Sequence, residues 1–205
     1  MIYEIRTYVL AVGTLSEVEK RFGEAYESRK KYSELAAFWH TEIGPLNEII
    51  HVWPYRDLAE RARVRAEASK DPNWPPKIGE FVRSMQSEIL VPFPFSPLLT
   101  PGKFGPIYEM RQYTVKLGKL PDLMKNWEAK LAGRMKLTPL AVAGNVDLGE
   151  ANRFIHIWPY NSLDQRAAIR SQAVQQGLWP PGGGAEQLLN QVNKIMLPAA
   201  FSPMQ

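Results

Sequence analysis

Apolar and polar positions alternate along residues 2–9, which are rich in the β-branched and aromatic types that favour strands. This alternation predicts a β-strand. Gly13 interrupts it, and residues 14–17 (Thr-Leu-Ser-Glu) have the pattern of a capping box at the start of a helix. Apolar residues then recur at helical spacing, in the order Leu15, Val18, Phe22 and Tyr26.

The rest of the first half continues this order. Residues 35–40 and 47–53 are apolar runs that predict two further strands, and Pro54 is predicted to end the second of them. Residues 58–68 predict a helix and residues 87–91 a last strand. The order β-α-β-β-α-β is typical of a ferredoxin-like domain, an antiparallel sheet with its helices on one face.

The chain repeats itself. Three stretches of the first half recur in the second: IYEIRTY (2–8) as IYEMRQY (107–113), HVWPY (51–55) as HIWPY (156–160), and WPP (74–76) as WPP (179–181). A proline-rich stretch, residues 92–106, separates the copies. We therefore predict an α+β protein made by tandem duplication of two ferredoxin-like βαββαβ domains. The predicted domains are residues 1–98 and 107–205, joined by a linker at 99–106, with their sheets packed as a pseudo-dimeric α+β barrel.

Alternation along the strands gathers the candidate site residues on one face. Each half should bring together a Glu, an Arg and a Tyr of its first strand and a His and a Trp of its third. These residues are Glu4, Arg6, Tyr8, His51 and Trp53, and in the second copy Glu109, Arg111, Tyr113, His156 and Trp158. Because the opposite face is aliphatic, we expect the helices to cover that face and the polar set to lie between the two sheets.

Two interpretations of this set stay open. It is either a hydrogen-bonded network that fills the contact between the sheets, or the lining of a ligand cavity. In a cavity, Arg suits an anion or a carbonyl, His suits proton transfer, and Trp and Tyr suit stacking. One difference between the copies stands out, since Trp39-His40 is replaced by Gly144-Asn145. It marks either an exchange of packing residues or divergence towards one asymmetric site.

Composition excludes several kinds of chemistry. The chain has 205 residues and no cysteine, so it has no disulfide, no thiolate nucleophile and no Cys-ligated metal. Its 3 histidines show no metal-ligand spacing, and no glycine-rich phosphate loop is present. We therefore predict no metal and no cofactor. We also expect no membrane insertion and a cytoplasmic location, because no long apolar run or signal-peptide pattern occurs.

The distribution of charge along the chain argues against binding of nucleic acid. The formal net charge is +4, residues 1–105 are balanced, and no basic stripe occurs. RNA-recognition modules share the β-α-β-β-α-β order, but their characteristic RNP pattern is missing.

The repeated IYEIRTY, His-x-Trp-Pro-Tyr, WPP and ILVPFPFSPL (89–98) stretches together resemble the NIPSNAP family. The resemblance implies a fold of the dimeric α+β barrel group, whose members include cofactor-free monooxygenases, haem-handling proteins and isomerases. It carries over no catalytic residue. We expect binding, with conversion as an open option, of a small apolar or aromatic molecule in a cavity between the sheets.

The alternatives are a non-enzymatic interaction module, suggested by an exposed PFPF segment (92–95), and a monooxygenase-like or isomerase-like enzyme. Apolar strand edges and proline-rich tails also predict a homo-oligomer.

Overall fold

The predicted order of elements occurs twice in the computed structural model, which describes residues 1–205. The first half contains β1 (Ile2–Leu10), α1 (Leu15–Arg29), β2 (Ala37–Ile43), β3 (Glu48–Tyr55), α2 (Leu58–Ala68) and β4 (Val82–Pro92). The second half contains β5 (Ile107–Val115), α3 (Leu120–Met135), β6 (Val142–Leu148), β7 (Arg153–Tyr160), α4 (Leu163–Gln175), α5 (Gly184–Gln187) and β8 (Leu188–Pro198). The predicted α+β fold with two ferredoxin-like repeats is confirmed.

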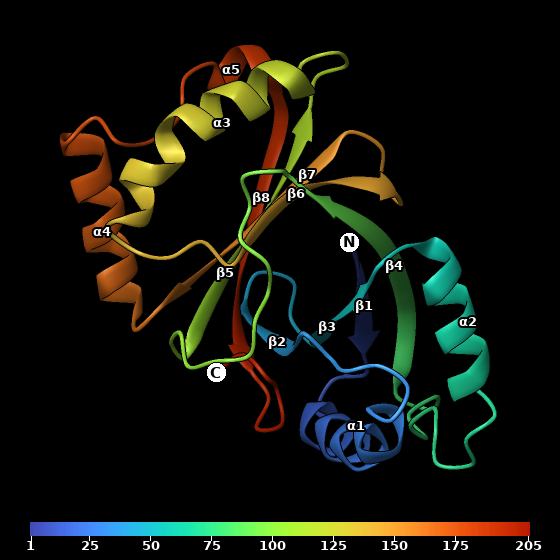
Figure 1. The fold of residues 1–205 in the computed structure, drawn as a ribbon. Coiled ribbons are helices and arrows are strands. Elements are labelled where there is room, and N and C mark those ends of the chain that lie inside the picture. The colour runs from blue at the N-terminus through green and yellow to red at the C-terminus, as the bar shows by residue number, and fades with distance from the viewer.

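All strands belong to one closed antiparallel barrel, in the order β1-β3-β2-β8-β5-β7-β6-β4. Each half contributes a four-stranded sheet, and the pairs β2–β8 and β4–β6 join the sheets edge to edge. Figure 1 shows α1 and α2 on one side of the barrel and α3, α4 and α5 on the opposite side. Because the barrel closes within one chain, the strand edges that motivated the predicted homo-oligomer are paired, and self-association stays a prediction.

Two local predictions are wrong. Pro54 does not end β3, which runs on to Tyr55, because the pairing of β3 with β2 ends at Val52 and leaves no partner for an N–H at Pro54. Thr14 makes no side-chain cap on α1 and donates its hydroxyl to the carbonyl of Ala11 at 2.8 Å instead.

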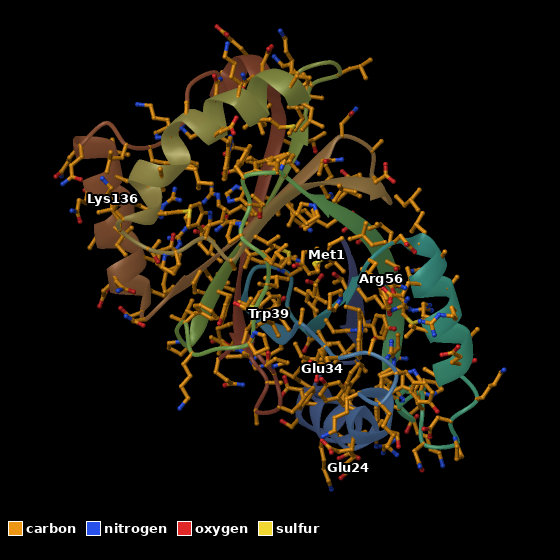
Figure 2. All side chains as sticks on the ribbon, viewed as in Figure 1. Met1, Glu24, Glu34, Trp39, Arg56 and Lys136 are labelled. Carbon is orange, nitrogen blue, oxygen red and sulfur yellow. The ribbon has the colours of Figure 1, made fainter.

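The barrel interior is filled by apolar side chains from both halves. Trp39 is fully buried there, with its ring centroid 5.1 Å from that of Tyr108. Figure 2 shows Trp39 near the centre of the molecule, whereas Glu24 lies on the outer side of α1. At the equivalent position of β6, a Cβ on Gly144 would lie 2.3 Å from the carbonyl oxygen of Val91. The difference between Trp39 and Gly144 is thus an exchange of packing residues in the interior.

The two junctions between the halves carry ion pairs in which equivalent positions of the repeat hold opposite charges. Lys194 Nζ lies 2.6 Å from Glu48 Oε2, and Arg153 Nη1 lies 2.9 Å from Glu88 Oε1. By the repeat, Glu48 is equivalent to Arg153, and Glu88 is equivalent to Lys194. The first half therefore supplies the carboxylate at both junctions and the second half supplies the cation.

The PFPF segment is not an exposed apolar patch. Phe93 is only 3% exposed, and its ring stacks on that of Phe154 with centroids 5.3 Å apart. The expected exposure, which motivated an interaction module, is therefore wrong, because the segment packs against the second half. No helix of the chain combines the length and the apolar character needed to cross a membrane.

Candidate functional site

Register places the predicted polar set together in each half. In the first half Arg6 pairs with His51 and Glu4 with Trp53 across β1 and β3. In the second half the same register joins β5 and β7, where His156 pairs with Arg111. Directly paired residues point to the same face of a sheet, so the predicted gathering of these side chains on one face is confirmed.

The face on which the set lies was predicted wrongly. The aliphatic face, with Tyr3, Ile5, Ile50 and Val52, forms the barrel interior between the two sheets. Trp53 belongs instead to the cluster that packs against the helices. Alternation could not decide between the faces, because both are buried along β3. Closing the barrel leaves no open sheet face, so the polar set lies between sheet and helices.

A cavity lies between the sheet and the helices in each half. The first cavity, of about 570 Å³, is lined by Arg6, Tyr8, His51 and Trp53 of the predicted set, with Glu4 buried beside it. The second cavity, of about 350 Å³, is lined by the full equivalent set: Glu109, Arg111, Tyr113, His156 and Trp158. The first helix of each half forms one wall, and the loops containing Trp74 and Trp179 form another.

Buried carboxylates anchor the arginines of each site. Glu4 is fully buried, and its Oε1 accepts hydrogen bonds from Arg6 (2.8 Å), Arg61 (2.7 Å) and Arg65 (3.2 Å). Burial by itself raises the pKa of Glu4, but the hydrogen bonds and charges of these arginines outweigh it and lower the pKa to about 2. Glu109 is held in the same way by Arg111 and Arg166.

The histidines of the two sites are neutral hydrogen-bond donors. Trp53 donates its indole N–H to Nδ1 of His51 at 2.7 Å, and Trp158 does the same to His156. An indole nitrogen only donates, so Nδ1 accepts and the proton of the neutral ring sits on Nε2. Burial, and next the charge of Arg6, lowers the pKa of His51 to about 3. The proton-transfer role expected for His is thus unsupported, because its lone pair is engaged by Trp.

Nε2 of each histidine is buried and has no hydrogen-bond partner in the protein. His51 is 2% exposed and His156 is 1% exposed, and both line a cavity. Because a buried donor without a partner costs about 1–3 kcal/mol, such an atom at a cavity wall is suited to an acceptor atom of a ligand.

Sequence reasoning missed the contributions of the helices. Arg29 at the end of α1 lies over Trp53, with its guanidinium carbon 4.4 Å from the ring centroid, and donates to the Tyr55 hydroxyl at 3.1 Å. Arg134 makes the equivalent contacts with Trp158 and Tyr160. The signal was present, since Arg29, Tyr55 and Trp74 of the first copy recur in the second as Arg134, Tyr160 and Trp179.

No part of the chain has a group of three or more His, Asp or Glu side chains placed to hold a metal ion. Tyr8 and Trp53 lie beneath helices, whereas RNA-recognition modules display their aromatic residues on an open sheet face.

Comparison with protein families gives two matches to one family model, NIPSNAP, at residues 3–97 and 108–203. Protein NipSnap homolog 3B of Homo sapiens is 29% identical over 213 residues, which cover 99% of this chain and 85% of that protein. Protein NipSnap homolog 3A of Homo sapiens is 27% identical over 215 residues, covering 100% and 86%.

Two solved structures that align with nearly the whole chain have low sequence identity to it. A putative monooxygenase from Lactobacillus acidophilus NCFM aligns with a TM-score of 0.72 and 11% identity, covering 97% of this chain and 94% of the other. An anthrone oxidase-like protein aligns with a TM-score of 0.61 and 12% identity, covering 98% and 93%. At this identity the likeness concerns the fold alone.

Proposed function

The chain belongs to the NIPSNAP family, and on that premise we propose that each half binds a small apolar or aromatic molecule in its cavity between sheet and helices. The observation that carries the proposal is an aromatic-lined cavity, present in both halves, whose lining includes a histidine with an unpartnered Nε2. Aromatic walls with a few polar groups are typical of small-molecule sites.

Binding is better supported than conversion. A monooxygenase-like or isomerase-like reaction that begins with proton abstraction needs a base, and the lone pair of each histidine is engaged by a Trp N–H. The interaction-module alternative has lost its main support, since Phe93 is buried. Two further predictions, the cytoplasmic location and the homo-oligomer, do not distinguish between these functions.

The test is a ligand screen on variants that fill one cavity each. Ser69 and Val174 are exposed equivalents that line the first and second cavity, so Ser69→Phe and Val174→Phe should narrow the cavities without disturbing the core. We expect apolar and aromatic compounds to raise the Tm of the wild type. Saturation at about a hundred times Kd stabilises a protein by about 2.7 kcal/mol, which shifts Tm by several degrees.

Each filled variant should lose part of this shift and the double variant should lose all of it. Val12→Phe is the matched control, because Val12 is 86% exposed and lines neither cavity. The proposal fails if a broad library of aromatic and apolar compounds leaves Tm unchanged, or if the double variant responds as fully as Val12→Phe.

A further inference from the structure

The first cavity is the more basic of the two. Its lining contains four arginines and no carboxylate, and these arginines are Arg6, Arg29, Arg65 and Arg83. The charged residues that line the second cavity are Arg111, Arg134, Arg170 and the carboxylate Glu109. A wall with an excess of positive charge raises the local concentration of anions.

The arginines of the first cavity are short of counter-charges. Arg6 and Arg65 share the buried carboxylate of Glu4, at 2.8 and 3.2 Å. Arg29 has no carboxylate within salt-bridge distance, since its two terminal nitrogens donate to neutral hydroxyl and carbonyl groups. An anionic ligand would therefore add a charge that the protein itself does not supply.

Arg83 distinguishes the two cavities, and a β-bulge places it among the lining residues. The register of β4 against β1 shifts between Val9 and Leu10, which leaves Arg83 as the extra residue of the bulge. Arg83 is exposed, and its side chain makes no hydrogen bond or ion pair. The same bulge in β8 carries Leu189, which is 67% exposed and does not line the second cavity. Only the first cavity thus offers a cation without a partner at a solvent-accessible position.

The apolar part of the first cavity suits a flat ring. Phe22, Trp53 and Trp74 line it, and the ring centroid of Trp74 lies 5.5 Å from that of Phe22 and 5.9 Å from that of Trp53. The ring planes meet at steep angles, 87° and 74°, so that both ring faces and ring edges are available to an aromatic ligand.

Resting on the proposed function, we propose that the first cavity prefers aromatic carboxylates to neutral aromatic molecules of the same shape. The ring lies among the three aromatic side chains, and the carboxylate pairs with Arg83, whose planar guanidinium matches its geometry. The second cavity binds aromatic molecules with a weaker preference for the anion, because Leu189 stands in place of Arg83 and Glu109 adds a negative charge to the lining.

The experiment compares two probes of the same shape, 2-naphthoate and neutral 2-naphthamide, by calorimetric titration of the full chain. Val174→Phe fills the second cavity and reports on the first, whereas Ser69→Phe does the reverse. We expect 2-naphthoate to bind more tightly than 2-naphthamide by about tenfold in Val174→Phe and by about twofold in Ser69→Phe.

Arg83→Leu, introduced into Val174→Phe, gives the first cavity the residue of the second. It should lower the preference for 2-naphthoate by about fivefold, a change within the range of an exposed ion pair. Because Arg83 is exposed, the variant should fold as the parent does. Arg63→Leu is the matched control, since it removes the same charge from an exposed position of α2 that lines neither cavity, and it should keep the preference.

The inference is overturned if both filled variants show the same preference, if neither probe binds Val174→Phe, or if Arg83→Leu changes the preference no more than Arg63→Leu does. Equal binding of both probes to Val174→Phe would leave the proposed small-molecule binding intact, whereas a library without any effect on Tm would remove both.

Discussion

The two cavities have nearly the same walls and different sizes. Both contain the Arg, Tyr, His and Trp side chains of the paired central strands, yet the first measures about 570 Å³ and the second about 350 Å³. The packing beside the cavities also differs between the halves. Phe22 and Phe38, with ring centroids 4.7 Å apart in the first half, are replaced by Trp127 and Ala143 in the second. The two cavities thus share their polar side chains and differ in the apolar side chains around them.

Where the halves meet, by contrast, the two copies differ in the chemical type of equivalent residues. Trp39 is equivalent to Gly144 in the barrel interior, and Glu48 and Glu88 are equivalent to the basic residues Arg153 and Lys194 at the junctions. A polar set kept only to hold the sheets together would be expected at these junctions. It lies instead at the cavities, which favours a role in binding over a role in joining the halves.

The largest expected effect comes from the barrel interior. Trp39→Ala removes the largest fully buried side chain and should lower the free energy of unfolding by about 3–5 kcal/mol. Gly144→Ala should cost less, about 1–3 kcal/mol, because the new Cβ meets the Val91 carbonyl and the backbone must shift. Urea denaturation followed by far-UV circular dichroism measures both.

Because both halves share the interior, each of these variants should unfold in a single transition. Two separate transitions would show that the halves unfold independently. A cost below about 1 kcal/mol for Trp39→Ala would show that the interior does not depend on this side chain.

A smaller effect is expected at the junctions. Glu48→Lys places two buried cations together and should cost about 3 kcal/mol, since Lys194 loses its only carboxylate. The double exchange Glu48→Lys/Lys194→Glu restores an ion pair and should recover most of that loss in urea denaturation.

At the other junction Glu88→Lys should cost less, because Arg153 retains Glu150 as a partner and is more exposed than Lys194. If the double exchange Glu48→Lys/Lys194→Glu recovers no stability, then packing around Glu48, and not charge, sets the stability of the junction between Glu48 and Lys194.

Much of the fold followed from local pattern. Strand alternation and the repeat predicted the element order, and the ferredoxin-like order then placed β1 beside β3, which groups Arg6 with His51. The side on which that group lies did not follow. Whether a sheet face meets helices or another sheet depends on closure of the barrel, and a strand buried on both faces carries no polarity that distinguishes them.

The site was only half predicted for a similar reason. The strand residues were found by alternation, but Arg29 and Arg134 come from the ends of α1 and α3, where basic residues ordinarily suit the helix dipole. Only their burial and the aromatic rings beneath them reveal a role in the cavities. Nη1 of Arg29 donates to Ser33, whereas Nη1 of Arg134 is buried without a partner, and no pattern in the sequence indicates this difference.

The smallest expected effect concerns cavity shape. Trp127→Phe gives the second half the aromatic residue of the first, and Ala143 cannot fill the vacated space as Phe38 does. We expect a loss of about 1–2 kcal/mol in stability and a larger second cavity. Calorimetric titration should then show 2-anthracenecarboxylate gaining about tenfold in affinity relative to 2-naphthoate.

The reciprocal change Phe22→Trp should narrow the first cavity and destabilise the chain, because Phe38 crowds the larger ring. If Trp127→Phe leaves the relative affinity unchanged, Trp127 does not set the size of the second cavity.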